Sequence, residues 1–551
     1  MKLSKRTSAL VATAIAGAML MTACGGSSDK GGGSSTAASG GTYSIYIGEP
    51  ENPLVPGNTS ESEGSQVIEA LWTGLVQYSN EDGSVQYTGV ADSIKSDDAT
   101  TWTVKLKDGW TFHDGTPVDA QSFVDAWNYT ALSTNAQGAS YFFANVEGYD
   151  KLQAKTDDAG NVVTPPSAKE MSGLKVVDDK TFTVTLTGPF AQYPVTVGYN
   201  AFYPLPKAFF KDPAAFGKKP IGNGPFKADA DFVPGQGVTV SRYDKYAGEE
   251  KAKADSVDFK VYTDVNTAYT DTQGGNLDVL NNIPPDAITT APDEFGDRYG
   301  ETPSSSFTYV GFPTYDPRYA DKRVRQAFSM AIDREAITKS IFHGTRTPAY
   351  SVIAPVVDGS RDDACKYCKV DVDKANQLLD EAGFDRKKPV DLWFNAGAGH
   401  DAWVEAVGNQ LRKNLGIEFT LQGNLDFSEY LPKGDAKGFT GPFRLGWSMD
   451  YPSPQDYLEP LYGTAAEPPA GSNSAFYSNP KFDELVKKGN EAKSNDEAIK
   501  DYQAAEDVLL EDMPIMPMFF GNEQTVWSDK VSNVKIDIFG RVDVASVTVN
   551  K

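Results

Sequence analysis

Cys365 and Cys368 have a spacing that suits chemistry, because only Lys366 and Tyr367 separate the two thiols. In an exported protein, two thiols this close usually form a disulfide bond. A redox-active pair of the same spacing begins a helix directly after a strand, whereas this pair lies in a polar stretch, residues 358–369, ahead of a predicted helix. A zinc site would need further His or Cys ligands, and none lies nearby in the sequence. We therefore expect a structural disulfide in a loop.

Residues for catalysis or metal binding are scarce, because the chain contains only three histidines, His113, His343 and His400. The sequence has neither the Gly-x-Ser-x-Gly turn that presents a catalytic serine nor the His-Glu-x-x-His pattern of zinc proteases. It also has no Cys/His cluster that would suit a transition metal. We expect no enzymatic activity, no metal site and no cofactor; an extracellular hydrolase is the distant alternative.

Cys24 is a third residue with its own chemistry, at the end of an N-terminal export signal. Lys2, Lys5 and Arg6 precede an apolar run over residues 9–21, and Ala23 stands directly before Cys24. A basic start, a short apolar run and a small residue describe a secretory signal peptide, and the run is short for a transmembrane anchor. With the cysteine after the cut, the segment resembles a bacterial lipoprotein signal. We expect removal of residues 1–23 and lipidation of Cys24; an ordinary signal peptide with an incidental cysteine is the alternative.

Composition places the folded part outside the membrane. Residues 24–41 are rich in Gly and Ser and lack large apolar side chains, so we expect a flexible linker there. No later apolar stretch has the length of a membrane helix. The formal net charge of −24 disfavours nucleic acid as a partner. A chain of 551 residues is too long for one core, so two or three domains are expected.

Segments with a two-residue period and segments with a helical period are interleaved, which indicates a mixed α/β architecture. Residues 101–106 and 181–186 alternate as strands do, and Asp119 is placed to cap a helix. Helices are predicted over residues 323–332, from Asp333 to before Gly344, and from Asp373 to Gly383. A further helix carries its apolar stripe on Ala498, Tyr502, Ala505 and Leu509, and a strand around residues 519–520 follows it.

Four ordered segments together resemble the family 5 extracellular solute-binding proteins of ABC importers, which include oligopeptide- and dipeptide-binding proteins. The segments are DGWTFHDGTP at residues 108–117, PIGNGPF at 220–226, VRQAF…AIDRE at 324–335, and DKA…LL…EAGF at 373–384. Each is weak alone, but they occur in the order of that family. Most are turns and core helices, so they identify a fold better than a ligand.

The resemblance implies a three-lobed α/β fold of the periplasmic-binding-protein type (type II, cluster C), with the ligand held between two lobes that close on it. Lobe I would comprise residues 42–76, 203–305 and 520–551, lobe II residues 77–202, and lobe III residues 306–519. It also implies a monomer at the outer face of the cytoplasmic membrane, anchored through Cys24. Such a protein captures an oligopeptide and delivers it to ABC permease subunits. The alternative solutes are a dipeptide, an oligosaccharide, haem or a nickel chelate.

A buried peptide would need a partner for each of its charged ends. The segment 444–451, RLGWSMDY, resembles the family segment whose aspartate binds the peptide ammonium group, and this match falls on Asp450. Trp447 matches a tryptophan that lines the pocket, and Arg444 matches an arginine near the ligand carboxylate. Tyr451 completes the motif. The alternative is that Asp450 caps a turn and Trp447 is a core residue.

Two further residues are weaker candidates by the same resemblance. His400 matches a histidine near the ligand carboxyl end, although a lone histidine in a Gly-rich loop is more often a surface residue. Tyr141 lies where the inserted lobe would meet the ligand. The chain has no tryptophan in residues 422–427, where oligopeptide binders often carry one. The pocket walls and the preferred ligand length are therefore left open.

Overall fold

The computed structural model describes residues 40–59, 61–80, 82–156, 162–396, 399–425, 427–468 and 471–550. The predicted signal peptide, Cys24 and the linker up to residue 39 lie outside these residues. Contacts divide the chain into residues 1–37 and 38–551, and all the described residues belong to the second unit. Within the described residues no helix is both long and apolar enough to cross a membrane.

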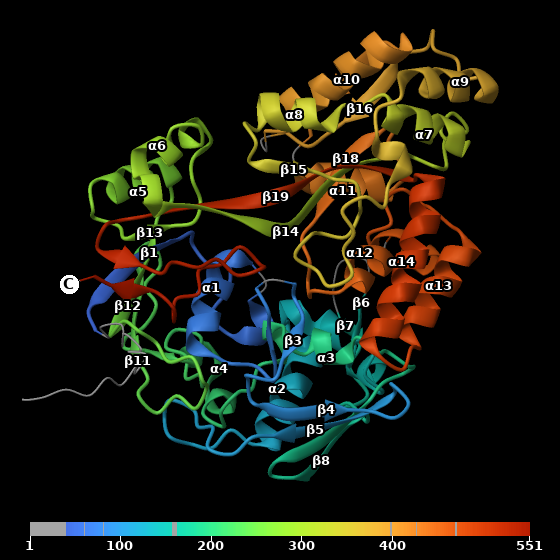
Figure 1. Cartoon of the computed structure of the whole chain (residues 1–551). Helices are drawn as coiled ribbons and strands as arrows, with labels where there is room; N and C mark the ends of the chain where they lie inside the picture. The colour runs from blue at the N-terminus through green and yellow to red at the C-terminus, as the bar shows by residue number, and fades with distance from the viewer. Residues whose placement is uncertain are drawn as a thin grey trace, which may run out of the picture. The chain divides into compact units, whose positions relative to one another are not determined.

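The largest element is an 11-stranded mixed sheet that draws strands from the whole chain (Figure 1). Its strands follow the order β10-β11-β12-β1-β13-β19-β14-β18-β16-β17, and β15 pairs with β19. Their bounds are β10 Phe226–Ala228, β11 Gly237–Arg242, β12 Ser256–Val261, β1 Thr42–Ile47, β13 Val279–Leu280, β19 Ile515–Trp527, β14 Tyr299–Gly311, β18 Phe443–Trp447, β16 Val390–Trp393, β17 Phe419–Gln422 and β15 Arg346–Pro348.

A second, antiparallel sheet has the order β4-β5-β9-β8, and three two-stranded ribbons complete the β structure. The strands of the sheet are β4 Ala91–Lys95, β5 Thr101–Leu106, β9 Thr181–Thr185 and β8 Leu174–Asp178. The ribbons pair β2 Gln77–Tyr78 with β3 Val85–Gln86, β6 Lys155–Thr156 with β7 Val162–Thr164, and β20 Val531–Ser532 with β21 Thr548–Val549. The two strands predicted at residues 101–106 and 181–186 are therefore confirmed, and they pair with each other.

Helices connect the strands, and their apolar stripes face the cores. The α-helices are α1 Ser62–Leu71, α2 Ala120–Ala131, α3 Tyr193–Thr196, α4 Pro213–Phe216, α5 Val265–Gln273, α6 Ala291–Phe295, α7 Lys322–Met330, α8 Arg334–Ile341, α9 Val372–Ala382, α10 Asp401–Leu415, α11 Phe427–Asp435, α12 Pro454–Tyr462, α13 Pro480–Asn490 and α14 Asn495–Asp512. Short 3-10 helices include η3 Gly138–Phe143, η5 Asn200–Phe202 and η9 Lys366–Cys368.

The predicted helices are confirmed, with one correction at a helix start and one at the strand that follows α14. Asp119 and Asp333 cap α2 and α8 as expected, since each side chain accepts a backbone N–H of the first turn. The cap of α9 is Asp371, whose carboxylate accepts the N–H of Lys374, and Asp373 lies inside the first turn. The C-terminal strand is longer than expected: β19 begins at Ile515 and contains Pro517.

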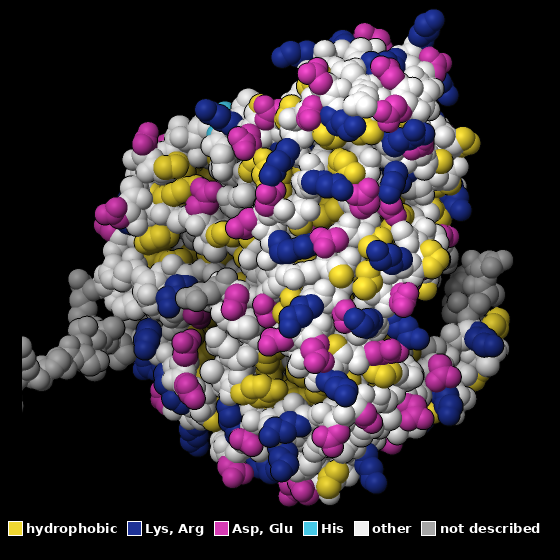
Figure 2. All heavy atoms as spheres, turned by 45° about the vertical axis from the view of Figure 1, so that its right-hand side comes forward, with side chains coloured by type: hydrophobic (Ala, Val, Ile, Leu, Met, Phe, Trp, Pro, Cys, Tyr) yellow, Lys and Arg dark blue, Asp and Glu magenta, His cyan; other side chains and the backbone are white. Residues whose placement is uncertain are grey.

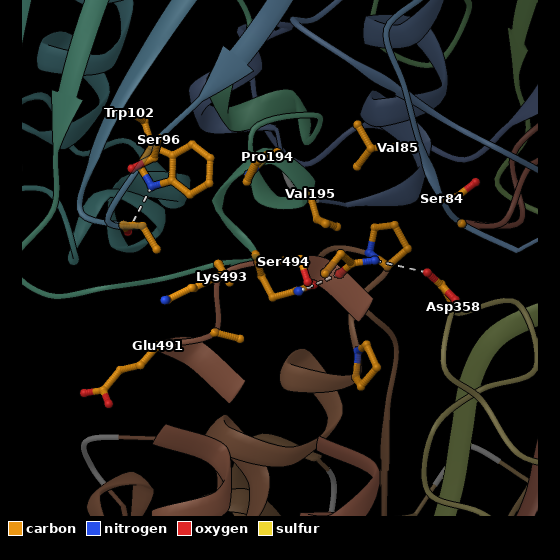
Figure 3. Close-up of a pocket in the computed structure, with 18 of the residues that line it drawn as sticks. Ser84, Val85, Ser96, Trp102, Pro194, Val195, Asp358, Glu491, Lys493 and Ser494 are labelled. Carbon is orange, nitrogen blue, oxygen red and sulfur yellow. Dashed lines mark hydrogen bonds between the residues drawn. The ribbon is translucent and has the colours of Figure 1, made fainter. Parts of the chain in front are cut away.

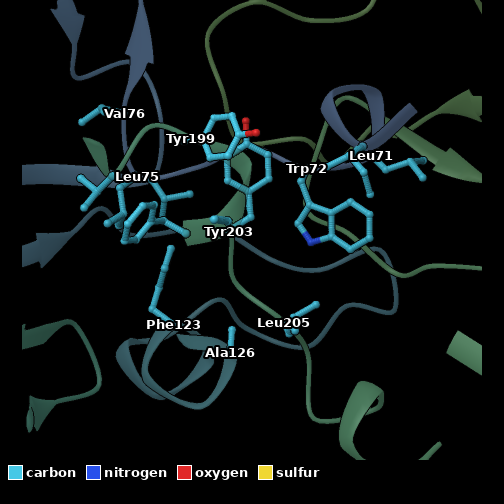
Figure 4. Packing of buried hydrophobic residues seen from close by; sticks show 14 of the residues in the cluster. Leu71, Trp72, Leu75, Val76, Phe123, Ala126, Tyr199, Tyr203 and Leu205 are labelled. Atoms are coloured by element: carbon cyan, nitrogen blue, oxygen red, sulfur yellow. The ribbon is translucent and has the colours of Figure 1, made fainter. Parts of the chain in front are cut away.

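The N-terminal half has one continuous core, which joins the end of α1, helix α2 and residues 199–205 (Figure 4). Trp72, Phe123 and Tyr203 all belong to it, and Trp72 donates its indole N–H to the Pro204 carbonyl at 3.0 Å. Two other clusters fill the part of the chain after residue 307, where α7 packs on α9 and α13 on α14.

The strands β14 and β19 run side by side from the first part of the sheet into the second (Figure 1). Their register shifts at two places, between Pro303 and Phe307 and between Thr308 and Tyr309, and the first shift leaves residues 304–306 unpaired in this ladder. The three serines there face a cavity instead. The lobe boundaries expected at residues 305/306 and 519/520 fall inside these two strands, and the division into lobes remains a prediction.

Candidate ligand-binding cleft

A cavity of about 500 Å³ lies beside the interruption in the β14–β19 ladder. Segments far apart in sequence line it: the end of β1, the start of α1, the serines of β14, the loop after β18, Glu523 of β19, and residues 539–541. Its charged lining residues are Glu63, Asp450, Glu523 and Arg541. Arg541 is already paired with Glu69 at 2.9 Å. The lining is therefore mainly acidic and suits a cation.

Asp450 is the sequence-predicted site residue that the structure places in this cavity. It lies in the loop between β18 and α12. Within the described residues its carboxylate has no hydrogen bond and no ion pair, so it does not cap a turn. Burial raises the pKa of Asp450 to about 6. A partly buried carboxylate without a partner is a suitable anchor for an ammonium group.

Asp456, which the sequence did not single out, lies directly behind Asp450. One of its oxygens, Oδ2, accepts the indole N–H of Trp447 at 2.9 Å and the backbone N–H of Asp450 at 3.1 Å. Its exposed fraction is only 2 %. Ser453 caps α12 and Pro454 occupies its first turn. In the sequence, an aspartate at position 456 is therefore explained by a favourable interaction with the dipole at the helix N-terminus. No local pattern could have revealed its contacts.

A second charged group, Arg444, lies six residues before Asp450 on β18, beside His400. Arg444 donates from Nη1 to the amide oxygen of Asn395 at 3.2 Å, and its Nε is buried without an acceptor. Among the described residues no carboxylate pairs with it. Burial, and to a smaller extent the positive charge of Arg444, lowers the pKa of His400 to about 4. The Nδ1 atom of His400 accepts the indole N–H of Trp403 at 3.3 Å. His400 is thus neutral near pH 7, and Arg444 is the group that could bind an anion.

None of the five other predicted residues lines the cavity: Arg444, His400, Trp447, Tyr451 and Tyr141. Trp447 orients its indole toward Asp456, and Tyr451 donates its hydroxyl to Gln455 and packs against the N-terminal core. Tyr141 is 53 % exposed and stacks on Phe142. Tyr199 lines the cavity instead, and sequence reasoning missed it because no motif surrounds it.

The family of the chain follows from comparison with known proteins. The family model described as bacterial extracellular solute-binding proteins, family 5 Middle, matches residues 86–468. The chain belongs to this family of solute-binding proteins. The members of the family are extracellular substrate-binding proteins, not enzymes.

This solute-binding protein is similar to several characterised relatives. It is 24 % identical to the oligopeptide-binding protein OppA of Bacillus subtilis, over 95 % of this chain and 96 % of the relative. It is 27 % identical to the periplasmic murein peptide-binding protein MppA of Escherichia coli, over 82 % of this chain and 83 % of the relative. The solved structure of the unliganded open form of the murein tripeptide-binding protein MppA superposes with a TM-score of 0.80 at 24 % identity, covering 93 % and 98 % of the two chains. The expected α/β solute-binding fold is thereby confirmed.

Two of the family motifs form a structural joint in this solute-binding protein. His113 accepts the N–H of Gly222 on Nδ1 at 3.2 Å, which leaves Nε2 to donate to the Gly224 carbonyl at 3.2 Å. The Gly224 N–H in turn donates to the carbonyl of Leu71 at the end of α1. A Cβ atom on Gly222 would lie 1.8 Å from the Leu71 carbonyl oxygen. The close contact between the two backbone segments therefore requires glycine at this position. These motifs therefore hold the fold together at a place away from the cavity lining.

Another cavity, of about 450 Å³, lies where residues 83–102 and 191–195 meet residues 491–495 (Figure 3). Gln192 bridges its two sides, donating to Asn495 at 2.7 Å and accepting from Ser453 at 2.9 Å. Asn495 also donates to Asp358 at 3.1 Å. Gln192 and Asn495 thus already have hydrogen-bond partners within the protein. We therefore do not assign the ligand to this cavity.

Cys365 and Cys368 are joined in a disulfide bond. The pair lies in η9, just before α9, and the exposed fractions of the two residues are 0 % and 2 %. Arg334 donates to the Cys368 carbonyl at 2.8 Å from within the core. A buried disulfide without a preceding strand has the character of a structural bridge, not of a redox site.

Proposed function

We propose that this solute-binding protein captures oligopeptides, with Asp450 as partner of the ligand ammonium group and Arg444 as partner of a ligand carboxylate. The observation that carries the proposal is the charge distribution along residues 444–456. Among the described residues no cation pairs with Asp450 and no anion pairs with Arg444, and both side chains are substantially removed from water. Since unpaired charges in a closing cleft are costly, a ligand with one positive and one negative end would satisfy both.

The relatives support a peptide over the other solutes. The names of the Bacillus subtilis and Escherichia coli relatives state that they bind oligopeptides and murein peptides, respectively. A carbohydrate has no cation for Asp450. For nickel, the described residues contain no group of three or more His, Cys, Asp or Glu placed to hold a metal ion. A dipeptide differs from an oligopeptide only in length, and the binding experiment below compares the two.

We further propose that the protein acts as the monomeric substrate-binding component of an ABC importer and has no catalytic activity of its own. It would be held by lipid on Cys24 at the outer face of the cytoplasmic membrane and would pass peptide to the permease subunits there. A flexible tether raises the concentration of the binding unit near its permease. Cys24 lies outside the described residues, so mass spectrometry of the membrane-extracted protein is the direct test of the lipid.

End-modified peptides test the assignment of the two charged residues. We expect N-acetylation of a tripeptide or tetrapeptide to weaken binding by about 2 kcal/mol or more, because Asp450 would remain buried without a cation. Asp450→Ala should weaken binding of the unmodified peptide by a similar amount and make acetylation nearly neutral. C-terminal amidation should show the same relation with Arg444→Gln. Isothermal titration calorimetry measures all combinations, and a dipeptide series gives the length preference.

Asp244 offers a matched control, because it is an exposed aspartate outside the cavity. Asp244→Ala should leave binding unchanged. Equal sensitivity to acetylation in the wild type and in the Asp450→Ala variant would remove Asp450 from the ammonium site. Tight binding of a fully end-blocked peptide would contradict the zwitterion assignment as a whole.

A further inference from the structure

Asp456 is the buried carboxyl group that the proposed binding scheme does not use. Its Oδ2 accepts two N–H groups, from the Trp447 indole and from the Asp450 backbone, at 2.9 and 3.1 Å. Because one oxygen holds both the tryptophan and the loop that carries Asp450, Asp456 fixes where the Asp450 carboxylate stands. Its place on α12, capped by Ser453, keeps it fixed in turn.

Among the described residues no cation contacts either carboxyl group, and Arg541, the one basic residue in the described cavity lining, is paired with Glu69 at 2.9 Å. The titratable groups that face Asp456 are Asp450 and four phenols, Tyr141, Tyr199, Tyr451 and Tyr457, which come from the inserted segment, the loop after β18 and α12 itself. Within the described chain neither carboxyl forms an ion pair with Lys, Arg or His. Two adjacent carboxylates that are removed from water and lack a cation repel each other strongly, so both cannot be ionised at once without a partner.

We propose that Asp456 is a positioning residue that shares one proton with Asp450 in the empty cleft, and that the ammonium group of an arriving ligand displaces this proton to solvent. The inference rests on the proposed function, because the ligand must carry a cation to Asp450. Before binding, the pair holds one proton and one negative charge. After binding, both carboxyl groups are ionised, the ammonium supplies the countercharge, and the released proton is taken up by the buffer.

The pKa directions agree with this arrangement. Burial raises the pKa of Asp450 to about 6, and burial together with repulsion from Asp450 raises the pKa of Asp456 well above its ordinary value. The ionised form of Asp456 is nevertheless prepared by its two N–H donors, which favour a charge there once a cation is present. Binding is therefore linked to pH: affinity should rise by up to about tenfold per pH unit over the range in which the pair holds its proton.

Calorimetry of trialanine and tetraalanine in two buffers of equal pH, phosphate and Tris, measures the proton directly, because the buffers differ in their heat of protonation. For the wild type at pH 7 we expect release of close to one proton per peptide bound. Asp456→Asn keeps an oxygen acceptor for the two N–H groups but cannot ionise. At pH 7 this variant should release close to no protons, and its affinity should depend little on pH between pH 7 and 8, above the pKa of about 6 that burial gives Asp450. Equal release by the two proteins, or no release by the wild type, would overturn the proposal.

Trp447→Phe is a second variant. It should strengthen proton binding by the carboxyl pair, whereas Asp456→Asn should remove it. It removes one donor to Asp456 but leaves both carboxyl groups, so the proton should be held more tightly and the rise in affinity should move to higher pH. A residue with a purely structural role would lower affinity in both variants without moving the pH profile. That outcome would also overturn the proposal.

The ligand-free protein separates this inference from the proposed function. A carboxyl group whose pKa is raised by folding binds protons more tightly in the folded state, so its contribution to stability declines as pH rises through the folded pKa. The wild type without ligand should therefore lose more thermal stability than Asp456→Asn between pH 5 and pH 8. If no peptide binds but this difference in stability is found, the proposed function is contradicted and the proposal that Asp450 and Asp456 share a proton is supported. If peptides bind but the two stability profiles coincide, the proposal of a shared proton is contradicted.

Discussion

Asp450 differs from the many carboxylates on the surface of this acidic chain because it lines a cavity and none of the described residues pairs with its carboxylate. Resemblance to a family motif was enough to predict its place at the cleft. Asp456 was not predicted, because no motif marks it and its role depends on two hydrogen bonds that form only when the loop after β18 folds onto α12. Arg444 and His400 were predicted separately, and their mutual proximity is a finding of the structure.

His113 gives a prediction at the residue scale. Burial lowers its pKa to about 4, while an unfolded histidine titrates near pH 6.5. The unfolded state therefore binds more protons between these values, and the neutral ring contributes stability at pH 7 that is lost as pH falls below about 6.5. By pH 5 this loss should reach at most about 2 kcal/mol, reduced where water reaches the ring.

His113→Ala makes that loss measurable by urea denaturation. The variant should be less stable than the wild type by about 1–3 kcal/mol at pH 7, because the N–H of Gly222 and the carbonyl of Gly224 lose their partner. The difference should shrink at pH 5, and peptide affinity at pH 7 should not change. His343 is exposed, and His343→Ala serves as the control. A difference that stays constant from pH 7 to pH 5 would mean that His113 is not neutral in the fold.

At the scale of elements, the sequence predicts what depends on local periodicity. The apolar stripe on Ala498, Tyr502, Ala505 and Leu509 is fully buried on α14, as its spacing indicates. The length of β19 was not predictable, because Pro514 and Pro517 interrupt the strand signal. Pro517 is nevertheless accommodated opposite Tyr309, close to a shift in register that relaxes the need for an N–H at that position.

The sequence predicts that α9 starts at Asp373, whereas in the structure Asp371 caps this helix. Asp371→Ala should destabilise the protein by about 1 kcal/mol, because the N–H of Lys374 loses its capping acceptor. Asp373→Ala is the matched control: the residue is exposed in the first turn and caps nothing, so its effect should stay within about 0.5 kcal/mol. Chemical denaturation of both variants decides between them. The reverse order of effects would show that the helix begins at Asp373 after all.

At the scale of the whole described chain, the strands β14 and β19 connect the two parts of the large sheet, and the cavity lies where their pairing is interrupted. Three unpaired serines at that point have no ladder hydrogen bonds to break, so movement there costs less than elsewhere in the ribbon. The surface in Figure 2 mixes acidic and basic side chains without a large patch of one sign on that face.

The order of the family motifs was sufficient to predict the fold. It was not sufficient to predict which distant residues together line the cleft. The segments that line the cleft come from residues as distant as Tyr46 and Arg541. The family resemblance implies that residues 520–551 return to the first part of the chain, and in the structure the Tyr43 hydroxyl donates to the Val544 carbonyl at 2.9 Å. Such non-local contacts determine the cleft, and only the three-dimensional structure shows them.

Native mass spectrometry of the purified protein tests peptide capture most directly. As isolated, the protein should carry a ladder of bound masses whose spacing matches amino-acid residues. Unfolding and refolding without ligand should remove the ladder, and added tripeptides to pentapeptides should restore bound masses of the expected size. Restoration should fail for N-acetylated peptides in the wild type. A single bound mass that is not a peptide, or binding that is indifferent to the free amine, would contradict peptide capture.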